Sequence, residues 1–240
     1  MGAQVCLMRG FELRVDARPV VVSQNAQRVL AFLALRDRPQ RRTTVASALW
    51  TDSTEDRAAA NLRTALWKLS DLRDRLVRSA GTYLSLCPDV DVDLSRLMQR
   101  TRRLQDSALD DGTGDAVVPA DVAAHVGELS ADLLPDWDED WLVFERERLR
   151  QYRIHALETL CRRLVRSGRF GDAVDAGLSA VESEPLRESA QRVLIEAHLA
   201  EGNVSEARRQ FDRYRTMLWD DMGLLPTVPL WTLVGVLRPE

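Results

Sequence analysis

The sequence predicts a mainly α-helical protein with a small β part, organised as two domains of opposite charge. Short β-rich stretches occur near the start of the chain and again near residue 80, whereas amphipathic helical patterns fill most of the remainder. Residues 1–90 hold 14 Lys and Arg against 9 Asp and Glu, a net charge of +5, and residues 91–240 carry −9. Because a chain of 240 residues has room for about one to two domains, we place a domain boundary near residue 90.

Composition excludes several classes of protein. Hydrophobic residues make up 45% and charged residues 29%, which is ordinary for a globular protein and rules out wholesale disorder. The longest apolar run, 29–35, is far below the ~18 residues that span a bilayer. Cys6, Cys87 and Cys161 are odd in number and far apart, which indicates buried free thiols in a reducing cytoplasm. We therefore expect a cytoplasmic protein.

The basic half begins with a predicted sheet and two helices. Three short β-rich stretches separated by turn residues indicate a small antiparallel sheet, at 5–8, 11–15 and 19–22. A helix is expected over about 24–36, and Pro39 blocks its continuation. Thr43 and Thr44 are suited to cap a short helix that ends at Leu49.

A long helix is predicted over 54–76, where Ser53 and Asp56 resemble a capping box and no Gly or Pro follows. Its apolar residues lie within about ±40° of one direction: Ala58, Leu62, Ala65, Leu69, Leu72 and Leu76. Polar residues fall on one flank, about 60–120° from that stripe: Arg57, Asn61, Thr64, Lys68 and Arg75. Arg63 lies on the other side of the outward face, and Trp67 points nearly opposite the core.

Strands over 77–80 and 82–86 flank Gly81 and predict a short hairpin, which Pro88 closes. A short helix, a turn and a long polar-flanked helix form a helix-turn-helix, and a hairpin directly after it forms a wing. The basic half is therefore predicted to be a winged helix-turn-helix domain.

The acidic half is predicted to be all-helical. We expect helices from about 91 to 104, over 120–129 and over 139–166, with a mobile loop at 107–119. Five positions recur 34 residues later, the period of tetratricopeptide repeats: Gly168, Phe170, Ala173, Gly177 and Ala180 are matched by Gly202, Val204, Ala207, Phe211 and Tyr214. A tetratricopeptide-like domain of stacked helix pairs follows from this period.

These motifs resemble a known family. The stretch RTTVASALW at 42–50, leading into AAANLRTALWKL at 58–69, resembles the DNA-binding domain of the Streptomyces antibiotic regulatory proteins. Four further stretches are similar to the bacterial transcriptional activator domain of the same family: 133–137, 144–149, 188–190 and 200–203. The resemblance covers about residues 5–230.

The resemblance implies an OmpR-type winged helix over 1–90 and a tetratricopeptide-like activator domain over 91–240. It also implies activation of a biosynthetic gene cluster, such as one for an antibiotic, by a homodimer on direct repeats in promoter DNA, with recruitment of RNA polymerase holoenzyme. The chain contains no G-x-x-x-x-G-K motif, so it is similar to the small members that lack an ATPase module. Because the first strand begins near Val5, we expect no phosphoacceptor domain ahead of the winged helix.

A protein that binds double-stranded DNA needs cations that contact the phosphates and a projecting element that enters the major groove. The candidate DNA-binding residues are Arg41, Arg42, Arg57, Asn61, Arg63, Thr64, Lys68, Arg75, Arg78 and Tyr83. Arg57 lies where a recognition helix usually enters the groove, and Asn61 and Thr64 are placed to read base edges. Arg63 is suited to a guanine or a phosphate.

The remaining candidates are expected at the DNA backbone. Lys68 and Arg75 lie further along the helix, and Arg41 and Arg42 precede the short helix, where all four can bind phosphates. The wing residues are suited to the minor groove or to phosphates, namely Arg78 and Tyr83. Trp67, which points outward, is expected to contact the second domain, a partner protomer or the polymerase.

No catalytic, metal-binding or cofactor-binding residues are predicted. A calcium loop starting at Asp89 would need glycine where Leu94 stands and glutamate where Arg100 stands. His155 and Cys161 do not have a zinc-site spacing, and G-x-S-x-G is absent from the sequence.

The sequence thus predicts a sequence-specific DNA-binding activator, associated with the nucleoid, that works without a cofactor and forms a dimer at least on DNA. The alternative is a tetratricopeptide-type adaptor that binds proteins and carries a non-specific basic winged domain, since a fold does not fix a function. An enzyme has no supporting group of residues.

Overall fold

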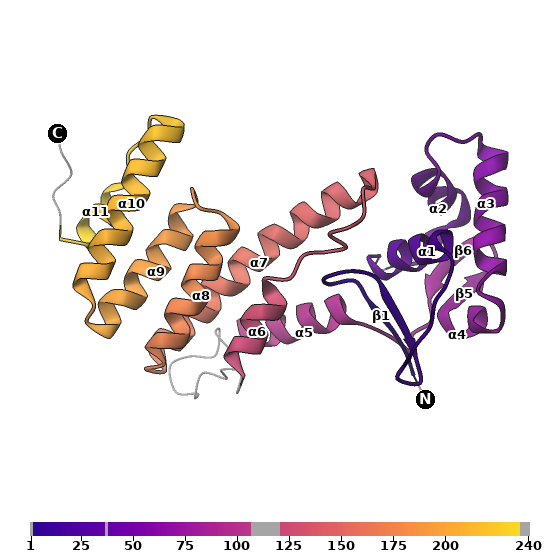
Figure 1. Ribbon diagram of the computed structural model, residues 1–240, viewed down its shortest axis with the longest axis horizontal. Helices are drawn as coiled ribbons and strands as arrows, with labels where there is room; N and C mark the ends of the chain where they lie inside the picture. Colours follow the sequence, from indigo (N-terminus) through magenta and orange to yellow (C-terminus); the bar gives the residue numbers. More distant parts are fainter. Residues whose placement is uncertain (1, 37, 107–120, 236–240) are drawn as a thin grey trace. The chain divides into compact units, whose positions relative to one another are not determined.

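The computed structural model describes residues 2–36, 38–106 and 121–235, and they form two compact units (Figure 1). Unit 1 comprises the described parts of 1–99 together with 131–147, and unit 2 comprises those of 100–130 and 148–240. The loop predicted at 107–119 lies outside the described residues.

Unit 1 contains two small sheets and a helix-turn-helix. Its strands are β1 (Ala3–Cys6), β2 (Glu12–Val15), β3 (Arg18–Pro19), β4 (Gln40–Arg41), β5 (Val77–Ala80), β6 (Tyr83–Leu86) and β7 (Val90–Val92). Its helices are α1 (Gln24–Ala34), α2 (Arg42–Leu49), α3 (Glu55–Trp67), the 3-10 helix η1 (Ser70–Leu72) and α4 (Arg73–Leu76). Two further helices begin in unit 1 and end in unit 2, α5 (Asp93–Asp106) and α7 (Asp140–Arg166).

The predicted N-terminal sheet is confirmed, and it gains a strand. The order is β3-β2-β1-β7, with β1, β2 and β3 antiparallel as expected and β7 parallel to β1. Directly after β7, the Asp93 carboxylate accepts hydrogen bonds from the backbone N–H groups of Leu7 and Met8, at 2.9 and 3.0 Å. The sequence did not predict β7 because three residues followed at once by a helix carry too little alternation to indicate a strand.

The prediction of one uninterrupted helix over 54–76 is wrong. α3 ends at Trp67, Ser70 has a left-handed backbone with φ 50°, and the chain continues as η1 and α4. The apolar period predicted one helix because Leu69 before the break and Leu76 after it are both buried, although the helix does not continue between them. The helix does start near Thr54, the N-cap residue, but the Thr54 side chain makes no capping hydrogen bond.

The apolar stripe of α3 is nevertheless buried as far as the helix extends. Ala58, Leu62 and Ala65 are at most 2% exposed, and Figure 1 shows α3 beside α2, on which it packs. Full burial of a leucine such as Leu62 contributes about 2 kcal/mol. Leu66 is buried as well, and this packing leaves Arg57, Arg63, Thr64 and Trp67 exposed to solvent.

Residues 131–147 pack onto the first sheet and α1 of unit 1. Leu134 donates its backbone N–H to the Leu7 carbonyl at 2.9 Å. The Trp141 ring meets Phe32 of α1 edge-on at 5.3 Å between centroids, and the Trp137 ring lies 5.8 Å from Phe11. Residues 131–147 thus belong to the same compact unit as the basic half. The domain boundary near residue 90 stays a prediction.

Half-buried ion pairs also hold residues 131–147 against the rest of unit 1. The Arg28 Nη2 donates to Glu139 Oε2 at 2.7 Å and to the carbonyl of Leu49, and Arg36 pairs with Glu145. Arg28 and Glu139 expose only 18% and 16% of their side chains. Glu139 thus has a partner in α1 that lies 111 residues away in the sequence.

Replacement of Arg28 should loosen the 131–147 segment. Arg28→Ala leaves the half-buried Glu139 carboxylate unpaired, at a cost of about 2 kcal/mol. We expect hydrogen exchange of the Leu134 amide to accelerate about thirtyfold. The matched control is Arg14→Ala, because the Arg14–Glu12 pair is exposed and contributes little. Equal exchange rates in the two variants would contradict the fastening role.

Unit 2 is all-helical. Besides the ends of α5 and α7, its helices are α6 (Val122–Leu129), α8 (Phe170–Ser183), α9 (Glu188–Glu201), α10 (Val204–Met222) and α11 (Val228–Leu233). The Asp121 carboxylate caps α6 by accepting the Ala124 N–H at 2.9 Å. In Figure 1, α9 lies between α8 and α10 and packs on both.

The 34-residue repeat is confirmed in the backbone. Gly168 and Gly202 both have left-handed conformations, with φ 72° and 89°, and a helix begins two residues after each. A side chain is strained at these two positions, so glycine is favoured. Ala173 and Ala207 are fully buried, and a Cβ added to Gly177 would lie 3.1 Å from the Leu194 Cα. Small residues therefore set the close approach of α8 and α9.

None of the helices among the described residues is both long and apolar enough to cross a membrane. The three cysteines are free. Cys161 is buried, and burial raises the pKa of its thiol to about 12. Cys6 and Cys87 are only half-buried, so the prediction of buried thiols holds fully for Cys161 alone.

Acid should destabilise unit 2 through His125. Burial, and then the charge of Arg100, lower the pKa of this imidazole to about 4. The unfolded chain therefore binds the proton more readily between about pH 6.5 and pH 4, and the free energy of unfolding falls by roughly 2 kcal/mol as the pH drops through that window.

Thermal melts across this pH range check the effect. His125→Gln should flatten the pH dependence, whereas His155→Gln, at an exposed site on α7, should retain it. A His125→Gln profile that parallels the native one would show that another group is responsible.

Candidate nucleic-acid interface

The solvent-facing side of α3 is acidic in the first turn, at Glu55 and Asp56, and carries cations beyond it. Arg57, Arg63, Thr64, Trp67 and Lys68 are exposed, and all lie away from the buried stripe. The thirteen residues of α3 extend about 20 Å, enough to lie along a major groove about 12 Å wide. The face therefore has the length and the chemistry of a recognition helix.

Its cations are unpaired. Within the part of the chain that the structure describes, the side chains of Arg57, Arg63 and Lys68 make no ion pair and no hydrogen bond. Many other arginines of unit 1 do have acidic partners, for example Arg28 and Arg36. Unpaired cations on one helix face attract phosphates without first losing an internal partner.

The two polar candidates of α3 differ in exposure. Asn61 is half-buried at the edge of the face. Thr64 is exposed, and its hydroxyl donates to the Ala60 carbonyl at 3.0 Å, one turn back in the same helix. The oxygen lone pairs and the methyl group of Thr64 are left for an external partner.

The wing is attached to the start of α2. β4, β6 and β5 form the second sheet in that order, with Arg41 opposite Tyr83. The Arg41 Nε donates to Tyr83 Oη at 3.2 Å, and this bond raises the pKa of the guanidinium. Arg42 donates from Nη2 to Ser79 Oγ at 3.2 Å and from its backbone N–H to the Thr82 carbonyl at 2.8 Å.

The hairpin predicted around Gly81 is confirmed, with β5 and β6 antiparallel. Arg78 is exposed on β5, and Tyr83 is 39% exposed at the start of β6. Contacts of Ser79 and Thr82 with Arg42 were not predicted, because the pairing of β4 with β6 joins segments about 40 residues apart.

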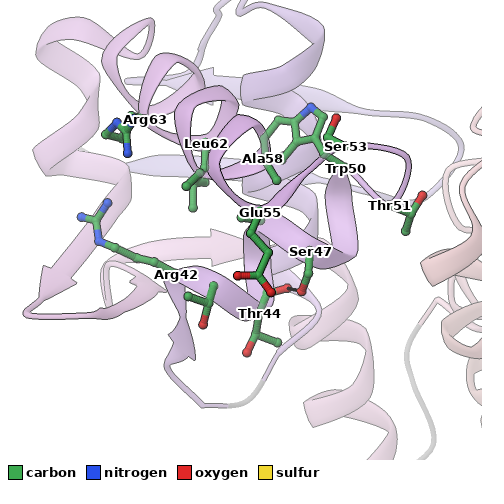
Figure 2. Close-up of a pocket in the computed structure, with 13 residues that line it drawn as sticks. Arg42, Thr44, Ser47, Trp50, Thr51, Ser53, Glu55, Ala58, Leu62 and Arg63 are labelled. Atoms are coloured by element: carbon green, nitrogen blue, oxygen red, sulfur yellow. Dashed lines mark hydrogen bonds between the residues drawn. The ribbon is translucent and has the colours of Figure 1, made fainter.

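A pocket of about 430 Å³ lies between α2 and α3 (Figure 2). Ala58 and Leu62 form part of its wall, and Arg42 and Arg63 line it together although they come from different helices. Hydroxyl side chains add to the lining, from Thr43, Thr44, Ser47, Thr51 and Ser53. The pocket thus brings one cation from the start of α2 and one from α3 to the same region, with the Glu55 carboxylate also in its lining.

Arg75 is the exception among the predicted residues. It lies on α4 instead of α3, and its Nη2 donates to both carboxylate oxygens of Asp16, at 3.1 and 3.2 Å. The expectation that Arg75 continues the flank of the long helix is wrong because the helix ends at Trp67. The other nine candidates lie on α3, at the start of α2 or on the strands of the second sheet, except Lys68, which directly follows α3.

Comparison with known proteins identifies the family. The family model of the bacterial transcriptional activator domain matches residues 92–235, more than half of the chain. The chain belongs to this family, and the predicted resemblance is confirmed on this point. A comparison with curated proteins finds no match.

The fold is similar to a solved structure of Mycobacterium tuberculosis EmbR in complex with a low affinity phosphopeptide. The TM-score is 0.77 at 21% sequence identity, over 97% of this chain and 64% of the EmbR chain. The chain thus spans less than two thirds of that protein. The similarity confirms the predicted fold class, a small sheet with a helix-turn-helix followed by a helical domain.

Proposed function

We propose that this protein is a sequence-specific DNA-binding transcriptional activator of the Streptomyces antibiotic regulatory type. The observation that carries the proposal is the group of three exposed cations on and directly after α3 whose side chains have no partner among the described residues, Arg57, Arg63 and Lys68. Membership of the activator-domain family supports the regulatory role. A protein-binding adaptor has no comparable reason to keep three unpaired cations next to a wing.

In the proposed complex, α3 lies in the major groove of a promoter. Arg57 enters near the helix start, Asn61 and Thr64 meet base edges, and Arg63 meets a guanine or a phosphate. Phosphates are bound by the cations around this helix, which are Arg41, Arg42 and Lys68. Arg78 and Tyr83 of the wing meet the minor groove or the backbone.

The resemblance to the family supports the further parts of the proposal. The protein binds as a homodimer to direct repeats that overlap a promoter of a biosynthetic gene cluster, and it recruits RNA polymerase holoenzyme there. The short reach of one winged helix favours two protomers on one operator. This role places the protein in the cytoplasm, at the nucleoid.

Selection of bound duplexes from a random DNA pool, followed by footprinting, tests the proposal. We expect an enriched sequence, present as a direct repeat, whose affinity exceeds that of random duplex and falls steeply with salt. A pool without enrichment would favour the adaptor alternative, in which the winged domain binds all duplexes alike.

Variants of base-reading residues and variants of phosphate-binding residues should differ in how they change affinity and sequence preference. Asn61→Ala or Thr64→Ala should cost about 1–3 kcal/mol on the selected duplex and relax the preference at one position. Lys68→Ala should weaken selected and random duplexes alike and reduce the salt slope by about one. Titrations of both duplexes at several salt concentrations measure this, and a uniform loss for Asn61→Ala would speak against base reading.

Arg75 should contribute less to DNA binding than Lys68. Because Asp16 already holds the Arg75 guanidinium, Arg75→Ala should change the affinity for the selected duplex less than twofold. The companion variant Asp16→Ala frees this cation and should tighten binding slightly at low salt. A loss for Arg75→Ala as large as that for Lys68→Ala would place α4 at the DNA.

A further inference from the structure

Trp67 is the most conspicuous side chain on the exposed face of α3. It is 76% exposed and is the last residue of the helix. At about 100° per residue, it points within about 30° of directly away from the buried stripe. An indole this large is rarely left in water, so a partner outside unit 1 is indicated.

The surroundings of Trp67 define the chemistry of that partner. Arg63 and Thr64 lie one helical turn before it, on the same side, and Lys68 follows it directly. Neither cation has a partner among the described residues. An apolar ring between unpaired cations is complementary to a surface that offers anionic groups beside apolar ones.

A second copy of this chain related by two-fold symmetry does not meet that requirement. In a symmetric dimer the same patch serves both protomers, so Arg63 and Lys68 would face cations of the other copy. Juxtaposed like charges disfavour such an interface. The duplex, in contrast, offers phosphates at the groove edge and thymine methyl groups and deoxyribose carbons between them.

We propose that Trp67 is a DNA-contacting residue. Its ring lies against thymine methyl and deoxyribose carbons at the edge of the major groove, and its Nε1–H is directed at a phosphate oxygen. One turn of helix advances about 5 Å, so a groove that admits Thr64 also brings Trp67 to the duplex. This inference rests on the proposed function and replaces the expected contact with protein.

Affinity for the duplex selected from the random pool provides the first test. Trp67→Ala should weaken binding about tenfold with an unchanged salt slope, because an apolar contact releases no counterions. Trp67→Phe retains an aromatic ring and should lose less than threefold. Trp219→Ala is the matched control, since Trp219 is 57% exposed on α10 in unit 2, and it should bind like the native protein. Native affinity in Trp67→Ala overturns the inference.

Acrylamide quenching provides a second readout that a merely structural role would not move. The emission of Trp67 is obtained by subtracting the fluorescence emission of Trp67→Phe from that of the native protein. This emission should be open to quencher in the free protein and at least twofold less quenched on the selected duplex. Emission that stays open on the duplex, or is already shielded in dilute free protein, overturns the inference in favour of no contact or a protein contact.

The two proposals fail in different ways. If the native protein shows no preference for any duplex, the proposed function fails and the inference falls with it. If the native protein binds the selected duplex and Trp67→Ala binds equally well, only the role of Trp67 fails.

Discussion

The burial of one apolar stripe on α3 determines what this protein presents to a ligand. Ala58, Leu62 and Ala65 are fixed in the core of unit 1, and their burial sets the rotation of the helix about its axis. A rotation of about 100° would move a cation into the core, and an unpaired buried charge costs far more than a leucine contributes. The outward direction of Arg57 and Arg63 is thus a consequence of the same packing that forms the core.

Backbone pairing extends this arrangement to the wing. β4 is only two residues long, yet its pairing with β6 joins the start of α2 to the hairpin. Arg41 and Arg42 contact Tyr83 and Ser79 as a result. Three segments that are distant in the chain therefore contribute to one basic surface, and none of them presents it alone.

The activator-domain match begins at residue 92 and includes the 131–147 segment that packs into unit 1. Trp137 and Trp141 meet aromatic rings of the basic half, and Glu139 pairs with Arg28. The family domain is therefore not self-contained in this chain. Substitutions in this segment act on the stability of the unit that carries α3.

Patterns within one element, or at a fixed offset along the chain, were readable from the sequence. The amphipathic stripe of α3, the hairpin around Gly81 and the 34-residue repeat belong to this class, because each depends on neighbours in sequence and on a regular period. Most of the DNA-binding candidates lie on elements that these patterns define.

Tertiary structure alone decided the rest. The break after Trp67 depends on the backbone of Ser70, and the pairing of β7 with β1 joins residues more than 80 apart. The Arg75–Asp16 ion pair joins α4 to the turn between β2 and β3. A periodic pattern carries no information on which distant group will satisfy a strand edge, a carboxylate or a guanidinium. Those partners are fixed only when the chain has folded, because the free energy of each contact depends on the burial that the other contacts create.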